Sequence, residues 1–89
     1  MAEERKPLKA RNLQIIDHLG TLYATFGAFP LWRMDNVSFG VWRLCDGERT
    51  VDQIAEELAS RINRSPEDVK PTVEEILNEL YKMKFIDWI

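Results

Sequence analysis

Residues that usually carry protein chemistry are scarce in this chain of 89 residues. There is one cysteine and one histidine, which leaves no internal disulfide and no Cys/His group with the spacing of metal ligands. The four glycines stand singly at positions 20, 27, 40 and 47, so there is no glycine-rich phosphate loop. We therefore expect no catalytic residue, no metal site and no cofactor.

An excess of positive charge and a long apolar run are also missing. The net charge is −3, whereas nucleic-acid-binding modules usually carry a basic surface. No segment approaches the roughly 18 apolar residues of a membrane span, and the opening segment "MAEERKPLKARN" has mixed charge and no apolar core of signal-peptide length. We predict a cytoplasmic protein without a membrane partner, and nucleic acid is disfavoured as a partner.

What the chain does contain fits one ordinary globular domain. Its residues are 45% hydrophobic and 30% charged, and a chain of this length has room for a single core. Residues 1–12 offer little apolar surface to bury. We therefore predict a flexible N-terminal tail over 1–12 and a single domain over 13–89.

The apolar residues between Leu13 and Met34 do not follow a helical stripe. The stretches "LQII", "TLYATF" and "PLWRM" are rich in aromatic, aliphatic and β-branched residues, and they are separated by Gly20 and by residues 27–30. This pattern predicts three short strands in one small antiparallel sheet. Pro30 stands at the entrance of the third strand, where a missing N–H group favours an edge position.

At Asp35 the spacing of the apolar residues changes to that of helices. Asp35 or Asn36 can cap a first helix, and Gly47 lies just past its end. The apolar positions of this helix are Val37, Val41, Leu44 and Cys45. Cys45 is then a small buried hydrophobe in the last turn rather than a reactive thiol, because no neighbouring residue would lower its pKa.

Two more helices have clear starts. Thr50 followed by Gln53 is a capping box, and Ser65 before Pro66 marks a third helix. Pro71 either kinks that helix or marks the point where its regular part begins. The apolar positions are Val51, Ile54, Ala55, Leu58 and Ile62 in the second helix, and Val69, Val73, Ile76, Leu77, Leu80 and Met83 in the third.

Three strands followed by three helices indicate an α+β fold, in which a small antiparallel sheet packs against a three-helix bundle. The same order describes a winged helix-turn-helix. The last residues, "FIDWI", are too apolar to lie free in water, so they should close the core or meet a partner. Trp42 is expected in the core, whereas Trp32 fits the core and a binding surface equally well.

The stretch "WRMDNVSFGVWRLCDGERTVDQIAEEL", followed by "VEEILNELYKMKFID", resembles the PqqD family of coenzyme PQQ synthesis proteins, the prototype of the RiPP recognition element. The resemblance rests on the Leu-Cys-Asp-Gly corner at residues 44–47, on the Thr-Val-x-x-Ile-x-x-x-Leu helix behind it, and on a last helix with a leucine-rich face. Met34-Asp35 replaces the usual Leu-Asn pair of the family, and Lys84 stands where many members have glycine.

The resemblance implies a peptide chaperone rather than an enzyme. It implies that the leader segment of a ribosomally made precursor peptide binds as an added strand, beside the third strand and against the last helix. A second implied partner is a modifying enzyme, often of the radical SAM type, in the synthesis of PQQ or a related peptide-derived product. Lys70, Lys82 and Lys84 could meet acidic leader residues. The residues implied in peptide binding are Leu31, Trp32, Arg33, Met34, Val73, Leu77, Leu80, Tyr81 and Lys84.

Other hypotheses stay open. A winged-helix regulator would bind DNA, although the acidic residues of the second helix, between Asp52 and Glu57, would face phosphates poorly. A structural adaptor would use "FIDWI" as its interface. The chain could act as a monomer or as a homodimer, because a strand edge and an apolar tail can each pair with a second copy.

Overall fold

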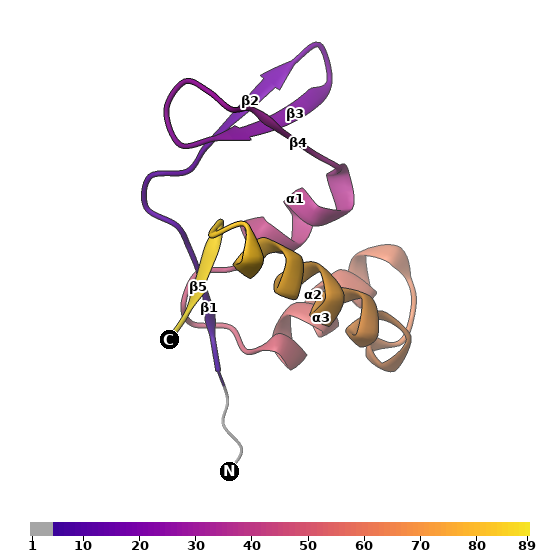
Figure 1. The fold of residues 1–89 in the computed structure, drawn as a ribbon. Coiled ribbons are helices and arrows are strands. Elements are labelled where there is room, and N and C mark those ends of the chain that lie inside the picture. Colours follow the sequence, from indigo (N-terminus) through magenta and orange to yellow (C-terminus); the bar gives the residue numbers. More distant parts are fainter. Residues whose placement is uncertain (1–4) are drawn as a thin grey trace.

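Three strands and then three helices follow one another in the expected order, and two further strands lie near the ends of the chain (Figure 1). The computed structural model describes residues 5–89. The strands are β1 (Pro7–Lys9), β2 (Gln14–His18), β3 (Thr21–Thr25), β4 (Trp32–Met34) and β5 (Ile86–Trp88), and the helices are α1 (Asn36–Arg43), α2 (Val51–Ile62) and α3 (Pro66–Lys82). The predicted α+β class and three-stranded antiparallel sheet are confirmed. None of the helices in the described range is long and apolar enough to cross a membrane.

The sheet of β2, β3 and β4 has β3 in its centre. His18 lies opposite Thr21 across a two-residue turn, and the backbone of both turn residues is left-handed, with φ of 54° at Leu19 and 87° at Gly20. A tight hairpin requires this conformation, and glycine adopts it without strain. Asp17 Oδ1 accepts a hydrogen bond from the Gly20 amide at 3.0 Å. Within the described sheet β4 pairs only with β3, so its predicted edge position is confirmed.

The first helix begins where the sequence predicts and ends slightly earlier. Asp35 caps α1, and its carboxylate accepts a hydrogen bond from the Ser38 amide at 2.7 Å. Leu44 is the C-cap, so Cys45 lies just past the helix rather than in its last turn, although it is fully buried as predicted. Val37 was predicted on the apolar side of the helix, but it is 59% exposed because it lines an open groove between helices.

Both later helix starts are confirmed. Thr50 and Gln53 form the complete capping box, in which each side chain bonds to the other residue's amide. α3 is helical from Pro66 and includes Pro71 within its length, so the alternative in which regular helix begins near Pro71 is wrong. Ser65 occupies the N-cap of α3 but makes no side-chain hydrogen bond there.

The hydrophobic core lies between the three helices and extends to the inner face of the sheet. Ile62 is the exception among the predicted positions of α2, because the last turn of that helix opens onto the same groove as Val37 and leaves Ile62 57% exposed. The buried core residues are Leu13, Ala24, Met34, Val41, Trp42, Leu44, Cys45, Ile54, Ala55, Ala59, Val69, Val73, Leu77, Leu80, Phe85 and Ile86.

Part of the segment predicted as a flexible tail is a strand. β1 pairs antiparallel with β5, and the Lys6 and Ile89 amides each donate to the other residue's carbonyl. Pro7 is fully buried in this pairing, which ties this part of the segment to the C-terminal strand. Residues 7–9 of the segment predicted as a tail therefore form a strand, while residues 1–4 lie outside the described range. "FIDWI" closes the core through Phe85 and Ile86, as the first of its two interpretations predicted.

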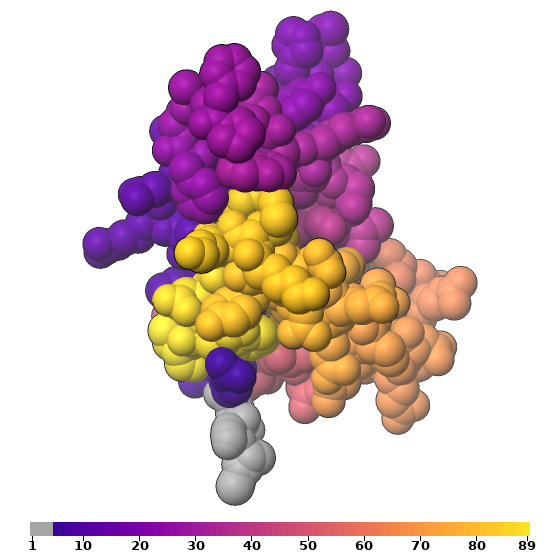
Figure 2. All heavy atoms as spheres, in the orientation of Figure 1, coloured from indigo at the N-terminus to yellow at the C-terminus, as the bar shows by residue number. Residues whose placement is uncertain are grey.

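The three-stranded sheet stands at one end of the molecule, above α1 and the C-terminal end of α3 (Figure 1). An aromatic cluster joins it to the helices: the ring of Trp32 meets that of Phe85 edge-on, with centroids 5.6 Å apart, and Phe26 lies 5.7 Å from Phe85. Figure 2 shows the C-terminal residues directly against the residues of this sheet. The cluster brings the start of β4 close to the end of α3.

Candidate functional site

Among residues 5–89, no strand pairs with one side of the β4 backbone. In an antiparallel sheet, successive residues direct their backbone groups alternately to the two neighbours. The two-residue turn between β2 and β3 sets this alternation, so that Tyr23 bonds toward β2. Trp32 and Met34 pair with the residues on either side of Tyr23 and therefore bond toward β3. Leu31 and Arg33 consequently direct their N–H and C=O groups to the open side, where a further strand could pair.

The nine residues implied in peptide binding fall into two groups. Met34, Val73, Leu77 and Leu80 are buried in the core. They support the surface around β4 and α3 from beneath but expose almost nothing to a ligand. The accessible group consists of the half-buried Trp32 and the exposed Leu31, Arg33, Tyr81 and Lys84.

Trp32 packs against the core and is also partly accessible at the surface, which are the two positions that the sequence left open. Its indole packs against Phe85 on one side and lies edge-on to Phe26, with ring centroids 6.1 Å apart. It is nevertheless only half-buried, so part of the ring faces solvent beside the open edge of β4. Trp42 is a core residue, as predicted, and its Nε1 donates to the Phe85 carbonyl at 3.1 Å.

An apolar groove opens beyond the Met34 end of β4. It has a volume of about 520 Å³ and lies between the first turns of α1, the end of α2 and the N-terminal half of α3. Val37 lines the groove and belongs to the helix that follows β4 directly, while Ile62 and Ile76 line it from α2 and α3. The sequence predicts all three residues at apolar positions of their helices. Their positions at helix ends or at the margin of an apolar stripe are the only signal that could have separated them from the core.

Lys84 adopts a backbone conformation that favours glycine. It has φ of 66° and follows the C-cap of α3, Met83. The Lys84 amide donates to Tyr81 O at 3.0 Å and the Phe85 amide to Leu80 O at 2.8 Å, which is the pattern of a Schellman motif. A lysine at this position therefore places a positive charge at the end of α3 at some cost in backbone strain.

Cys45 is protected rather than activated. Its thiol is fully buried and donates to the Val41 carbonyl at 3.3 Å. Burial raises the pKa of Cys45 to about 12, an effect that Lys9 partly offsets. Because only a thiolate is a good nucleophile, this thiol is unsuited to covalent chemistry near neutral pH. Within residues 5–89 there is no cluster of three or more His, Cys, Asp or Glu residues able to hold a metal ion.

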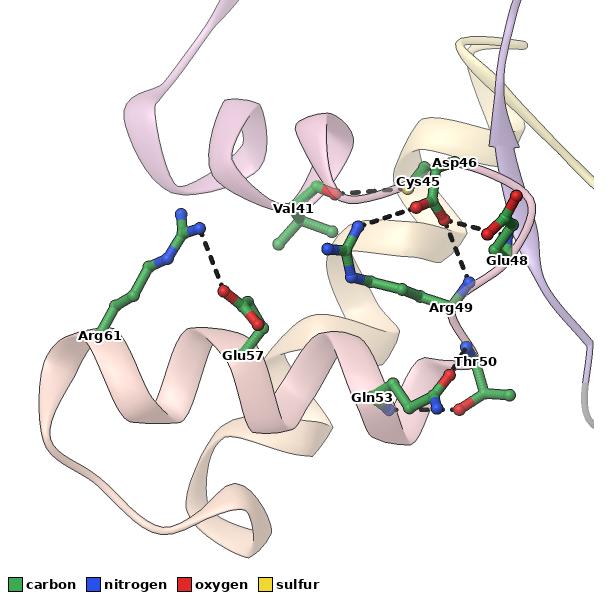
Figure 3. Close-up of polar contacts among 9 residues, drawn as sticks. All are labelled: Val41, Cys45, Asp46, Glu48, Arg49, Thr50, Gln53, Glu57 and Arg61. Atoms are coloured by element: carbon green, nitrogen blue, oxygen red, sulfur yellow. Dashed lines mark hydrogen bonds and ion pairs between the residues drawn. The ribbon is translucent and has the colours of Figure 1, made fainter.

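The Asp-Gly corner after Cys45 is a structural turn. The Asp46 carboxylate accepts hydrogen bonds from the amides of Glu48 and Arg49 and forms an ion pair with the Arg49 side chain at 2.9 Å (Figure 3). These interactions, led by the Glu48 amide, hold the pKa of Asp46 below its usual value. The adjacent Gly47 has φ of 78°, and a Cβ there would lie 3.1 Å from the side chains of Leu8 and Ile89. The corner thus positions β1 against the helices.

The fold and this geometry describe a small α+β domain with an open strand edge, an apolar groove and a buried thiol. The chain belongs to the family described as coenzyme PQQ synthesis protein D (PqqD), whose model matches residues 30–86. The suspected resemblance is therefore confirmed. The match covers β4 and all three helices and leaves out β1, β2, β3 and all but the first residue of β5. Members of this family are accessory, non-catalytic proteins, which is compatible with the expectation that this chain is not an enzyme. Comparisons with curated proteins and with solved structures return no match.

Proposed function

We propose that this protein binds the leader segment of a ribosomally made precursor peptide as a fourth strand on the open side of β4 and presents the peptide to a modifying enzyme. The observation that carries the proposal is the unpaired side of β4 at Leu31 and Arg33, beside the C-terminal end of α3. An added strand gains main-chain hydrogen bonds, and pockets for alternate side chains supply selectivity.

The two ends of β4 give the bound peptide a direction. The sheet is antiparallel throughout, and an antiparallel addition would run from the Met34 end of β4 toward the Leu31 end. The N-terminal residues of the peptide then lie near the apolar groove that Val37 lines. We therefore expect the leader to place one or two large apolar side chains in that groove before its strand-forming residues.

Moderate affinity is sufficient for this function. A leader peptide that is disordered when free loses conformational entropy on binding, which offsets part of the contact energy. The role proposed for the domain is delivery of the peptide rather than catalysis. Membership of the PqqD family supports an enzyme partner in the synthesis of PQQ or a related product, and we propose a radical SAM enzyme in that position.

Peptide selection followed by solution NMR tests the proposal. A random peptide display library is selected on the immobilised protein, and the best binder is synthesised and titrated into isotope-labelled protein. We expect chemical-shift changes at β4 and at the C-terminal half of α3, together with slower hydrogen exchange at the Arg33 amide, because that amide gains a carbonyl partner.

A matched pair of variants isolates the backbone contribution. Leu31→Pro removes an N–H group on the open side of β4, whereas Leu31→Ala keeps that donor and shortens the side chain. We expect Leu31→Pro to weaken binding of the selected peptide about fivefold relative to Leu31→Ala, the value of roughly one hydrogen bond. Equal affinities in two folded variants would contradict strand addition.

The DNA-binding alternative finds no support in the surface of α2. Asp52, Glu56 and Glu57 lie on this helix, and Asp52 pairs with Lys70 at 2.7 Å, which neutralises a cation that could have met a phosphate. A helix with this charge would be repelled by the phosphate backbone. The winged helix-turn-helix likeness stays a prediction, and it carries no argument for DNA binding.

A further inference from the structure

We propose that a basic groove at the C-terminal end of α3 holds an acidic segment of the bound peptide, immediately after the residues that pair with β4. The inference rests on the proposed strand addition and adds to it the charge of the partner. The groove has a volume of about 740 Å³ and lies between β1, β5 and the last turn of α3. Its apolar lining includes Leu8, Ala10, Tyr81 and Ile86.

The groove is positively charged, whereas the chain as a whole is negatively charged. The protein carries a net charge of −3, yet four cations line the groove with a single carboxylate, that of Asp87. The Asp87 carboxylate is engaged with the Trp88 amide at 2.9 Å. The four cations are Lys9, Arg11, Lys82 and Lys84.

Among the residues that the structure describes, these cations are largely without acidic partners. Lys82 lies 3.9 Å from Glu79, and both side chains are well exposed, so their interaction is weak. Within residues 5–89, no ion pair of 4.0 Å or less is formed by Lys9, Arg11 or Lys84. Lys9 lies over the ring of Trp42, 5.6 Å from its centroid. The groove therefore concentrates positive charge that a ligand could neutralise.

An aromatic contact links the start of β4 to the segment that lines the groove. Trp32 contacts Phe85, and Phe85 directly follows Lys84. A strand added antiparallel to β4 leaves the edge at its Leu31 end, next to this contact. Its next residues, on the C-terminal side of the paired segment, are then within reach of the groove. By contrast, the apolar groove at the Met34 end meets the N-terminal side of the same peptide.

The occupant that fits is a peptide rather than a nucleic acid. The apolar atoms around Leu8 and Ile86 suit side chains and peptide backbone better than a phosphate chain. The net charge of −3 on the chain would oppose binding of a duplex that extended beyond the groove. Carboxylates spaced along an extended peptide can meet cations from β1 and α3 together.

The first experiment is an NMR titration with hexaglutamate, which does not require a strand on β4. We expect shifts at the amides of Arg11 and Lys84, an affinity that falls at least tenfold between about 50 and about 500 mM NaCl, and no comparable shifts with hexaglutamine. Replacing the four groove cations by glutamine should remove the shifts. The control, Arg43→Gln with Arg49→Gln, removes two cations that line neither groove and should retain the shifts. Absence of shifts from hexaglutamate would overturn the groove assignment.

The second experiment tests the order of segments in one peptide. A peptide selected on the protein is extended by four glutamates at its C-terminal end, at its N-terminal end, or by four glutamines at either end. We expect C-terminal glutamates to tighten binding about fivefold, because each exposed charge pair contributes a factor of roughly 1.5 to 5. N-terminal glutamates should tighten binding less, because the groove at that end is lined by two arginines and Asp68 rather than by four cations and one carboxylate.

The outcomes separate this inference from the proposed function. Equal effects of glutamate at both ends would overturn the inference and leave strand addition intact. Equal binding by Leu31→Pro and Leu31→Ala would remove strand addition, whereas the hexaglutamate result would still report on the groove alone. Tighter binding of a DNA duplex than of hexaglutamate at the same amides would overturn the peptide assignment in favour of nucleic acid.

Discussion

The sheet of β2, β3 and β4 and the bundle of three helices differ in surface composition: the sheet has few charged residues and many exposed hydrophobic ones, whereas the helices are rich in charge. Between Leu13 and Trp32 the only acidic or basic residue apart from His18 is Asp17, whereas α2 alone carries Asp52, Glu56, Glu57 and Arg61. Half of the large hydrophobic side chains that are exposed belong to this one small sheet and its turns: Ile16, Leu19, Phe26, Phe29 and Leu31.

This difference suggests that the helices contribute most of the stability and that the sheet provides the surface available to a partner. The helices supply most of the buried core residues, and burial of apolar surface is the main stabilising contribution. The sheet leaves apolar side chains and an unpaired strand edge in solvent, where they add little to stability and are available to a partner. Substitutions in the helical core should therefore mainly change the free energy of unfolding, and substitutions on the exposed face of the sheet should mainly change partner binding.

The largest contrast concerns thiol reactivity. Because burial raises the pKa of Cys45 from its ordinary 9.0 to about 12, we expect its reaction with a thiol reagent at pH 8 to be about a thousandfold slower in the folded chain than in the unfolded chain. A cysteine at the exposed end of the sheet, Leu19→Cys in a Cys45→Ala background, should react like a free thiol. Similar reaction rates for Cys45 and for the cysteine at position 19 would contradict the expected protection of Cys45 by burial.

The Cys45 thiol should also make the folded state less stable as pH rises above 9.0. Below pH 9.0 the thiol is neutral in both states, and its burial has no linked cost. Between pH 9.0 and about 12 only the unfolded chain releases the proton, so the free energy of unfolding should fall as pH rises through this range. Cys45→Ala should lessen this fall when the two proteins are compared by urea denaturation.

The next largest effect is a cavity in the helical core. Leu77 is 1% exposed, and Leu77→Ala should lower the free energy of unfolding by about 3 kcal/mol because it removes buried methyl groups and leaves a void. Phe29→Ser removes a larger side chain that is 85% exposed, yet it should change the same quantity by less than about 0.5 kcal/mol. Urea denaturation measures both, and comparable losses would remove the distinction between the two regions.

A smaller effect is expected where the two regions meet. Trp32→Ala should cost about 2 kcal/mol, because the half-buried indole packs against Phe85 and Phe26. Hydrogen exchange should show faster opening of β3 amides while the amides of α2 and α3 keep their protection. Leu31→Ala, at the neighbouring exposed position, is the control. Unchanged exchange in β3 would mean that the sheet does not depend on this aromatic contact.

The smallest effect is a gain in stability. Lys84 has a left-handed backbone, so Lys84→Gly should raise the free energy of unfolding by about 0.5 to 1 kcal/mol. Lys82→Gly, at the last helical position of α3, should instead lower it by a similar amount. The stabilised variant loses one groove cation, so it should bind hexaglutamate more weakly, and a gain in both properties would contradict its assigned place in the groove.

Local signals made most of the fold predictable. The alternation of short apolar stretches with turns indicated three strands, and the caps at Asp35, Thr50 and Ser65 marked the helix starts. β1 and β5 were not predictable in the same way. Each has three residues, and their partners lie at opposite ends of the chain, so neither segment carries a pattern of its own.

The candidate site was predictable only in part, because an apolar pattern does not distinguish a core from a groove. Val73, Leu77 and Leu80 were implied in peptide binding and are buried, whereas Val37 was predicted on a buried face and lines an open groove. The basic groove depends on β1, and its pairing with β5 brings distant cations together. Lys84 was marked in advance by its departure from the glycine of many family members, and its positive φ supplies the physical reason for that glycine.

The pairing of β1 with β5 also has a consequence for the order of folding. The hairpin of β2 and β3 and the contacts between α2 and α3 join residues that are near in sequence, whereas Pro7 meets Trp88 across almost the whole chain. Closing so long a loop is entropically costly and is favoured only after other structure has shortened it. We therefore expect β1 to dock late, so that the edge of β4 exists before the basic groove does. A chain in which β1 has not yet docked could then pair a peptide with the edge of β4 but could not bind its acidic segment in the basic groove.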